Sequence, residues 1–267
     1  MGRSAALEGV VAVVTGALGR LGPVWVRALA DAAASVAGID VAEDGAGELQ
    51  EAVERRGGRY LGLCADVTDR GSLEEARSRI EDEWAAPAVL VNNAGIDQPP
   101  TASATTALVE DVAGEDFLRT VEVNLLGTFH ATQVFGPAMV AAGRGSIVNV
   151  GSLYAGIAPE PRFYDHLPVD PPFLKPAAYG ASKAGVVNLT RYFARLWGPH
   201  GVRVNAISPG GVGDGQDEEF KRKYCARVPL GRMADLADLG GPLLFLASDA
   251  SRYVTGHELK VDGGSTA

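Results

Sequence analysis

The stretch from Val10 to Gly22, V-V-A-V-V-T-G-A-L-G-R-L-G, decides how this chain begins to fold. Its first five residues are apolar and mostly β-branched, which predicts a short buried strand. Gly16, Gly19 and Gly22 then allow a tight turn, and the Ala/Leu-rich residues 24–33 predict a helix. This arrangement brings unpaired backbone N–H groups to the positive end of a helix dipole, which suits a pyrophosphate; a purely structural turn is the alternative.

The next predicted strand, residues 35–39, follows that helix and ends in Asp40. An acidic residue about 20 positions beyond such a glycine turn accepts a ribose 2′-hydroxyl and repels a 2′-phosphate. Arg20 and Arg27 could favour the phosphate, but an aspartate at the strand tip should outweigh a loop arginine. We therefore predict NAD rather than NADP, with a helix cap or an exposed turn residue as the alternative role of Asp40.

Two further predicted strands lead into residues that suit a cofactor. The strand at 60–63 leads to Asp66 and Val67, and the Asp66 carboxylate either reaches an adenine amino group or caps the helix that follows. The strand at 89–91 leads to Asn92-Asn93-Ala94-Gly95. Small and amide residues directly after a buried strand suit a flat cofactor lying across the strand ends, and a plain loop is the alternative.

The rest of the chain continues to alternate helices and strands. Helices are predicted over 47–56, 70–84, 115–141, 177–197, 217–227 and 235–246, and strands over 145–150, 202–207 and 257–261. This alternation predicts an α/β fold with a parallel sheet. Because no repeat, low-complexity tract or linker interrupts it, we expect one domain over residues 1–267.

Composition and charge exclude several classes of protein. The 267 residues are 46% hydrophobic and 21% charged, which suits one large domain with a well-buried core. A net charge of −9 argues against nucleic-acid binding, and no apolar run approaches the ~18 residues that span a bilayer. Cys64 and Cys225 form no disulfide framework or zinc pattern, and the four histidines lack paired ligand spacing. We expect a cytoplasmic protein without a metal.

Residues 153–178 are the least regular part of the chain. They contain six prolines, which forbid a continuous helix or central strand. Long loops in compact domains are usually functional or disordered, and Phe163, Tyr164 and Phe173 are available to pack. We therefore predict that this insertion forms an ordered lid or pocket wall near the active site.

Tyr179 and Lys183 are four positions apart in a segment of helix-forming composition, so they share one helix face. A phenol with a pKa near ~10 is a poor proton donor or acceptor at neutral pH unless its anion is stabilised. An ammonium group one turn away provides such stabilisation, which makes the pair a candidate general acid/base. A chance pair on a solvated face is the alternative.

Taken in chain order, a series of motifs extends from about Leu7 to Gly264. They are T-G-A-L-G-R-L-G, Asp40, Asp66-Val67, Asn92-Asn93-Ala94-Gly95, Asn124, Ser152, the Tyr179/Lys183 pair, Pro209-Gly210 and Val261-Asp262-Gly263-Gly264. The series resembles the short-chain dehydrogenase/reductase family, in its compact single-domain branch. The resemblance implies a single-domain Rossmann fold, with a seven-stranded parallel sheet and helices on both faces. It also implies a nicotinamide cofactor and a homotetramer or homodimer.

The resemblance further implies roles for individual residues. Tyr179 resembles the family's acid/base, and Lys183 the residue that lowers its pKa and holds the nicotinamide ribose. Ser152 resembles the hydroxyl that orients the substrate oxygen, and Asn124 the helix-kinking asparagine that positions a water for proton relay. The residues expected to bind NAD are Gly16, Gly19, Arg20, Leu21, Asp40, Asp66, Val67, Asn93, Ala94, Gly95, Tyr179, Lys183, Pro209, Gly210 and Val212.

The chain departs from the family pattern in its first turn and after its sixth strand. Arg20 stands where the compact branch has its middle glycine, and the observed spacing is more like the extended branch. The sequence that follows Lys183 is short, however, which leaves little room for the larger substrate domain of that branch. Asp214 stands where the family often has a threonine, which puts that cofactor contact in doubt.

The spacing between the serine and the tyrosine is also unusual. The separation of Ser152 and Tyr179 in the sequence is about twice the usual family gap. Ser182 and Ser146 are therefore weaker candidates for the same role. The position directly after the predicted strand 145–150 nevertheless favours Ser152.

The expected function is NAD-dependent hydride transfer between nicotinamide and a secondary alcohol, hemiacetal or ketone. The insertion carries Arg162, Tyr164, Asp165, His166 and Lys175, which favours a sugar, polyol or sugar derivative as the small-molecule substrate. A ketoreductase of a natural-product pathway is the alternative within this class. A non-catalytic NAD-binding sensor or scaffold is the alternative from another class, although such proteins commonly lose the tyrosine or lysine that this chain has.

Overall fold

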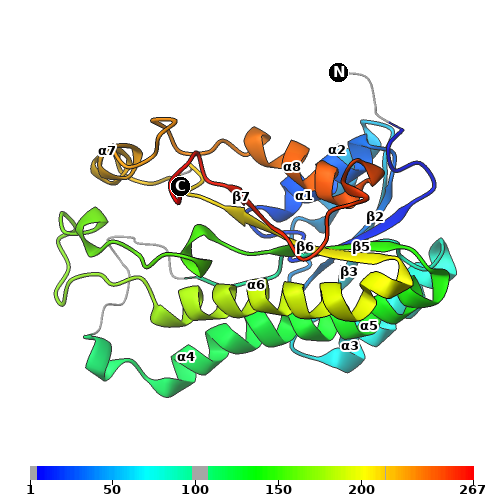
Figure 1. Cartoon of the computed structure of the whole chain (residues 1–267), viewed down its shortest axis with the longest axis horizontal. Helices are drawn as coiled ribbons and strands as arrows, with labels where there is room; N and C mark the ends of the chain where they lie inside the picture. The colour runs from blue at the N-terminus through cyan, green and yellow to red at the C-terminus, as the bar shows by residue number, and fades with distance from the viewer. Residues whose placement is uncertain (1–4, 98–107, 214) are drawn as a thin grey trace.

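One parallel sheet runs through the computed structural model, which describes residues 5–97, 108–213 and 215–267 (Figure 1). The strands are β1 (Val11–Thr15), β2 (Ser35–Asp40), β3 (Arg59–Cys64), β4 (Val89–Asn92), β5 (Gly145–Val150), β6 (Val202–Pro209) and β7 (Glu258–Val261). Their order is β3-β2-β1-β4-β5-β6-β7, and every neighbouring pair is parallel. The described residues thus confirm the predicted seven-stranded parallel sheet. The strand order reverses between β1 and β4, and at such a point the carboxyl ends of the strands open a crevice.

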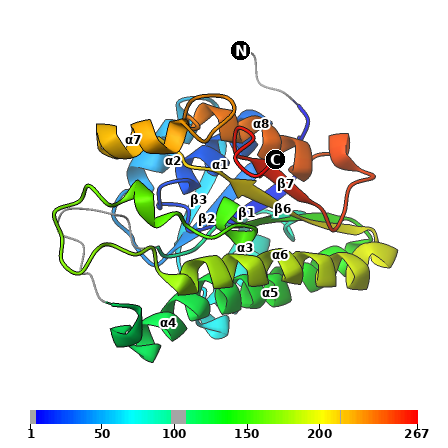
Figure 2. The ribbon, with the colours of Figure 1, turned by 60° about the vertical axis from the view of Figure 1, so that its left-hand side comes forward.

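Helices cover both faces of the sheet, because its strands are nearly continuous aliphatic runs that must be buried on both sides. The helices are α1 (Gly22–Asp31), α2 (Ala46–Glu54), α3 (Arg70–Glu83), α4 (Gly114–Val121), α5 (Gly127–Ala142), α6 (Ala177–Trp197), α7 (Glu218–Cys225) and α8 (Ala237–Ala247). Ala12 and Val14 of β1 pack with α1, α2 and α8, whereas Val11 and Val13 pack with α3, α5 and α6 (Figures 1 and 2).

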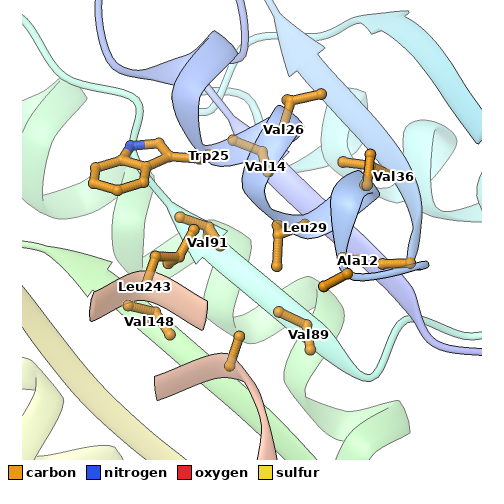
Figure 3. Packing of buried hydrophobic residues seen from close by; sticks show 14 of the residues in the cluster. Ala12, Val14, Trp25, Val26, Leu29, Val36, Val89, Val91, Val148 and Leu243 are labelled. Atoms are coloured by element: carbon orange, nitrogen blue, oxygen red, sulfur yellow. The ribbon is translucent and has the colours of Figure 1, made fainter. Parts of the chain in front are cut away.

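Helix α1 connects the core to the turn that follows β1. Trp25 and Leu29 of α1 pack in the same cluster as Val91 of β4 and Leu243 of α8 (Figure 3). The indole Nε1 of Trp25 also donates a hydrogen bond to Asn93 Oδ1 at 2.8 Å. The core thereby holds the start of α1 against the end of β4, where the crevice opens.

The long helix predicted over 115–141 is interrupted. Helix α4 passes into a π-helical turn, η2 (Glu122–Leu126), before α5 begins. A π-helical turn inserts an extra residue into the helix and turns one side chain out of the regular pattern. Here that turn contains Asn124, which is fully buried between α6 and the segment after β4.

The proline-rich insertion, residues 153–178, packs as an ordered segment against α7. It contains two short 3₁₀ turns, η3 (Leu153–Ala155) and η4 (Pro161–Phe163). Phe163, Tyr164 and Phe173 pack with Phe220 and Tyr224, and ring centroids lie as close as 5.0 Å. We call these five residues the aromatic cluster, and it joins the insertion and α7 into one packed unit.

Ion pairs reinforce the same contact. Arg227 Nη1 lies 3.1 Å from Glu160 Oε2, and His166 Nε2 lies 2.8 Å from Asp217 Oδ1. Lys223 of α7 pairs with Asp165. Because each pair has one member whose side chain is 47–60% exposed, we assign the packing energy to the aromatic cluster rather than to the charges.

The Phe173→Ala substitution should release the insertion and α7 together. Phe173 is 2% exposed, and truncating a buried Phe costs about 3–5 kcal/mol where neighbours cannot relax; we expect about 3 kcal/mol in this peripheral cluster. Hydrogen exchange should then become faster in residues 160–175 and 218–228 alike.

Leu174→Ala is the matched control, because the neighbouring Leu174 is 42% exposed and its truncation should change the free energy of unfolding by less than about 0.5 kcal/mol. Faster exchange in the insertion with unchanged exchange in α7 would show that the two are not one unit.

Candidate active site

A cavity of about 680 Å³ opens along the carboxyl ends of the strands. This volume lies within the range of about 300–1,000 Å³ that is typical of cofactor and ligand sites. All of the residues predicted to bind NAD line its wall, and so does Ser152. Residues of the insertion, among them Tyr154, Tyr164 and Lys175, form another part of the wall. Asp214, which stands where the family often has a threonine, lies outside the described residues.

The glycine turn at one end of the cavity is built for close backbone approach. Gly16 has φ +63°, and a Cβ there would lie 2.7 Å from Ala94 Cα, so only glycine fits. The turn is held by Asn93, whose Nδ2 donates to Gly16 O at 2.8 Å and to Thr15 O at 3.0 Å. The predicted contact residue Asn93 therefore positions the turn through its side chain.

Helix α1 begins at Gly22, directly after the wall residues Gly19, Arg20 and Leu21, so its N-terminus lies at the same end of the cavity. None of the described side chains caps this helix, and its described first turn holds no acidic residue. The positive end of the helix dipole attracts an anion at such a position. These residues fit the pyrophosphate of a dinucleotide.

Asp40 lies at the end of β2 and lines the cavity. Its Oδ2 accepts from Leu18 N at 2.9 Å and its Oδ1 from Ala42 N at 3.2 Å. A carboxylate has about four acceptor positions, so the side chain can also accept ribose hydroxyls. Arg20 points toward the segment after β6, where its Nη2 donates to Val212 O at 2.6 Å, and Arg27 is exposed on α1. The charge at the tip of β2 is therefore that of Asp40.

Asp66 and Val67 line the cavity after β3. Asp66 Oδ1 accepts from Thr68 N and from Thr68 Oγ1, both at 2.8 Å. The cap of α3 is Asp69, whose side chain accepts from Gly71 N at 2.9 Å. The alternative role of Asp66 as the helix cap is therefore wrong.

Ser152 and Tyr179 meet although the whole insertion separates them in the sequence. The Ser152 hydroxyl is hydrogen-bonded to the Tyr179 phenol, and its Oγ also accepts from Tyr154 N at 3.2 Å. The other two candidate serines are committed elsewhere. Ser146 Oγ donates to Leu246 O at 2.8 Å, and Ser182 Oγ donates to Tyr179 O at 2.7 Å.

Lys183 faces the same side of α6 as Tyr179. Its Nζ lies 5.9 Å from the centre of the Tyr179 ring and donates to Val150 O at 2.8 Å. Burial lowers the pKa of Lys183 to about 8. Gly95 is close by, since a Cβ at that position would lie 3.4 Å from Lys183 Nζ.

The pKa of Tyr179 differs from the sequence expectation. Burial raises it to about 12, the charge of Asp97 also raises it, and the Ser152 hydrogen bond opposes these effects. The sequence predicts that Lys183 lowers this pKa, but desolvation dominates. The protein's own groups therefore keep the phenol protonated at neutral pH.

Asn124 is close to this pair but does not belong to the described wall of the cavity. Its Nδ2 donates to Ile96 O at 3.0 Å and to Ser182 Oγ at 3.1 Å, and its Oδ1 accepts from Ile96 N at 2.7 Å. Both amide protons are thus used within the protein. The side chain thereby positions the Ile96 segment and the start of α6, and the role of Asn124 in a proton relay stays a prediction.

The sequence did not predict that Asp97 and Lys175 form a pair in the wall of the cavity. Lys175 Nζ lies 2.5 Å from Asp97 Oδ2 and 5.6 Å from the centre of the Tyr179 ring. The two residues are 78 positions apart, so no local pattern could bring them together. Their positions in two irregular segments near the site were the only available signal.

Searches for other kinds of site concern the described residues alone. In that part of the chain, no group of three or more His, Cys, Asp or Glu side chains is arranged to hold a metal ion. The described helices include none that is long and apolar enough to cross a membrane.

Comparisons with known proteins agree with this geometry. The family model "short chain dehydrogenase" matches residues 10–165, and the model "Enoyl-(Acyl carrier protein) reductase" matches residues 169–266. The chain is 37% identical to the galactitol 2-dehydrogenase (L-tagatose-forming) of Cereibacter sphaeroides, over 97% of this chain and 96% of that protein.

Two solved structures are similar over nearly the whole chain. A gluconate 5-dehydrogenase from Burkholderia cenocepacia, in complex with NADP and tartrate, has a TM-score of 0.85 and 30% identity, covering 99% of this chain and 98% of that one. A 3-oxoacyl-[acyl-carrier protein] reductase from Brucella melitensis with bound NAD has a TM-score of 0.84 and 28% identity, covering 98% and 93%.

The first family model covers more than half of the sequence, and the galactitol 2-dehydrogenase match spans nearly all of it. The fold inferred from the motifs is the fold observed. This chain belongs to the short-chain dehydrogenase/reductase family of oxidoreductases.

Proposed function

We propose that this protein is an NAD-dependent dehydrogenase that interconverts a secondary alcohol and a ketone of a sugar, polyol or sugar derivative. The observation that carries the proposal is the joining of Ser152, Tyr179 and Lys183 on the wall of one cavity with the residues suited to a dinucleotide. The presence of both Tyr179 and Lys183 on the wall of the cavity also argues against a non-catalytic sensor.

The bound nicotinamide would accept the hydride from the carbinol carbon and contribute a positive charge. Ser152 would hold the substrate oxygen through its hydroxyl. Tyr179, as the phenolate, would take the proton as the substrate O–H bond breaks and the carbonyl forms. The Lys183 ammonium, fixed by Val150 O, would stabilise the phenolate and hold the nicotinamide ribose. In the reverse reaction the Tyr179 phenol returns the proton to the oxygen.

The choice of NAD rests on Asp40. Its carboxylate lies at the tip of β2, and Arg20 donates instead to Val212 O in the segment after β6. A 2′-phosphate would therefore meet the negative charge of Asp40. Relatives with bound NAD and with bound NADP both occur, so the family alone does not decide the cofactor.

The substrate class rests on Tyr164 and Lys175, the two polar insertion residues predicted to favour a sugar that line the cavity, and on the galactitol 2-dehydrogenase relative. Arg162, Asp165 and His166 do not line the cavity. Reduction of a carrier-bound ketone is the second candidate, because the 3-oxoacyl reductase structure is similar over the whole chain. Turnover of a polyol, but not of an acyl thioester, distinguishes the two.

Replacing Tyr179 by Phe should lower kcat/KM for alcohol oxidation by about 10²–10⁴-fold, because the proton acceptor is lost. Wild-type oxidation should rise with pH, since burial holds the Tyr179 pKa high and the phenolate is the active form. Carbonyl reduction, which needs the phenol, should not rise. Absorbance of reduced nicotinamide measures both directions.

Tyr253→Phe is the matched control, because Tyr253 is a fully exposed tyrosine that does not line the cavity. It should leave kcat/KM unchanged. Full activity in the Tyr179→Phe variant would reject the assignment of the acid/base.

Replacing Asp40 by Asn should raise the ratio of NADP to NAD use by about tenfold or more, because the like-charge repulsion is removed. Asp82→Asn makes the same charge change on an exposed part of α3 and should leave the ratio unchanged. Steady-state kinetics with each cofactor give the ratio. A wild-type protein that prefers NADP would contradict the choice of NAD.

We also propose a homodimer or homotetramer built through the long helices. Leu118 of α4 and Tyr192 and Leu196 of α6 are exposed apolar side chains on these helices. Light scattering at micromolar concentration should give a multiple of the 27.7 kDa chain mass, and a monomer would contradict the proposal.

The proposed location is the cytoplasm, where Cys64 and Cys225 would remain free thiols. Cell fractionation tests this location.

A further inference from the structure

Asp97 and Lys175 form a charge pair at the end of the cavity that holds Tyr179. Both residues line the cavity, and Lys175 comes from the insertion whereas Asp97 follows β4. The Lys175 Nζ is 2.5 Å from Asp97 Oδ2 and lies over the Tyr179 ring. The Lys175 side chain is 8% exposed and that of Asp97 is 33% exposed. The carboxylate is thus the more accessible member of the pair.

Two tyrosines lie near Asp97 in the wall of the cavity. Tyr154 and Tyr164 both line the cavity and are hydrogen-bonded to each other. Asp97 lines the same cavity and pairs with the Lys175 that lies over the Tyr179 ring, and its charge acts on both of these phenols and on Tyr179 and Lys183. Since Asp97 and Lys175 cancel each other's charge, they add donors and acceptors to this wall without adding net charge.

Such a wall selects between two kinds of substrate. A carboxylate can accept from neighbouring hydroxyls of a polyol, and an ammonium group can donate to another. An acidic substrate that approaches Lys175 must also approach Asp97, and like charges at an interface disfavour the wrong ligand. Relatives of this chain include a polyol dehydrogenase and a gluconate dehydrogenase, so family membership does not decide between neutral and acidic substrates.

We propose that Asp97 and Lys175 bind the hydroxyl groups of an uncharged polyol or sugar, and that Asp97 prevents Lys175 from selecting substrates that carry a carboxylate. This inference rests on the proposed dehydrogenase function and specifies the substrate class of the same site. Asp97 and Lys175 are then specificity-determining residues, whereas proton transfer is the role of Tyr179.

The test compares alditols with the aldonates of the same carbon skeleton. The pairs are galactitol and galactonate, glucitol and gluconate, and threitol and threonate, each with NAD at one ionic strength. For the wild-type chain we expect kcat/KM for the preferred alditol to exceed that for its aldonate by about tenfold or more. The Asp97→Asn substitution should lower this ratio at least about tenfold, because Lys175 then attracts the carboxylate.

The Lys175→Met substitution removes the ammonium group but retains a side chain of similar length, so the negative charge of Asp97 is no longer balanced by Lys175. It should raise the KM for the alditol about tenfold with little change in kcat, and it should raise the ratio further. Asp97→Glu and Lys175→Arg retain a charge pair, so their ratios should stay within about threefold of the wild-type ratio. A merely structural role would change both substrates by the same factor and leave the ratio constant.

The outcomes separate the two proposals. If the wild-type chain oxidises none of the six compounds, both the polyol dehydrogenase function and this inference are overturned. If it oxidises alditols but Asp97→Asn leaves the ratio unchanged, or if it prefers aldonates, the inference alone fails. Should Lys175→Met not fold, the comparison of Asp97→Asn with Asp97→Glu gives the decision by itself.

Discussion

The structure of this site depends on one buried charge. The ammonium group of Lys183 donates to the carbonyl oxygen of Val150, where β5 ends. A buried cation without such a partner is strongly unfavourable, so this bond fixes how α6 is rotated against the sheet. Tyr179, one turn earlier on the same helix face, is therefore directed into the cavity. Ser152, two residues after Val150, meets it there. The end of one strand and the rotation of one helix thus assemble all three groups.

The same burial determines the charge state of the pair. Desolvation raises the pKa of Tyr179 to about 12 and lowers that of Lys183 to about 8, so it opposes ionisation of each group. A low-dielectric site disfavours one isolated charge more than an adjacent pair of opposite charges. The phenolate is therefore stable only while a cation lies beside it. Ser152 helps by hydrogen bonding to the phenol oxygen, and Asp97 acts against it. The simple expectation that a lysine lowers the tyrosine pKa omitted this cost of burial.

The fold could be predicted because its signals are local. The aliphatic run before Gly16 and the glycine turn specify a strand, a turn and the start of a helix within one short stretch. Elsewhere in the chain, helix α8 begins at Ala237, two residues from the start that the sequence predicts. The cofactor wall followed from the same logic, since residues after parallel strands meet at one edge of the sheet. The π-helical turn around Asn124 could be expected only from the family resemblance, which implies a helix-kinking asparagine there; local propensity does not show it, because the turn depends on bonds to Ile96, 28 residues away. The Asp97–Lys175 pair escaped for the same reason, since only the packed insertion brings its members together.

The long sequence separation of Ser152 and Tyr179 explains how chemistry and selectivity coexist on this fold. The insertion leaves the end of β5 and returns to the start of α6, and both points lie at the same edge of the sheet. The entropic cost of closing such a loop rises only slowly with its length. Extra residues therefore need not disturb the hydrogen bond between Ser152 and Tyr179. Those residues gain their own support from the aromatic cluster with α7, independent of the central core. Lys175 can therefore be placed over the Tyr179 ring by a segment that shares no strand or helix with the proton-transfer groups. Selection of the substrate is in this way separated physically from the reaction that acts on it.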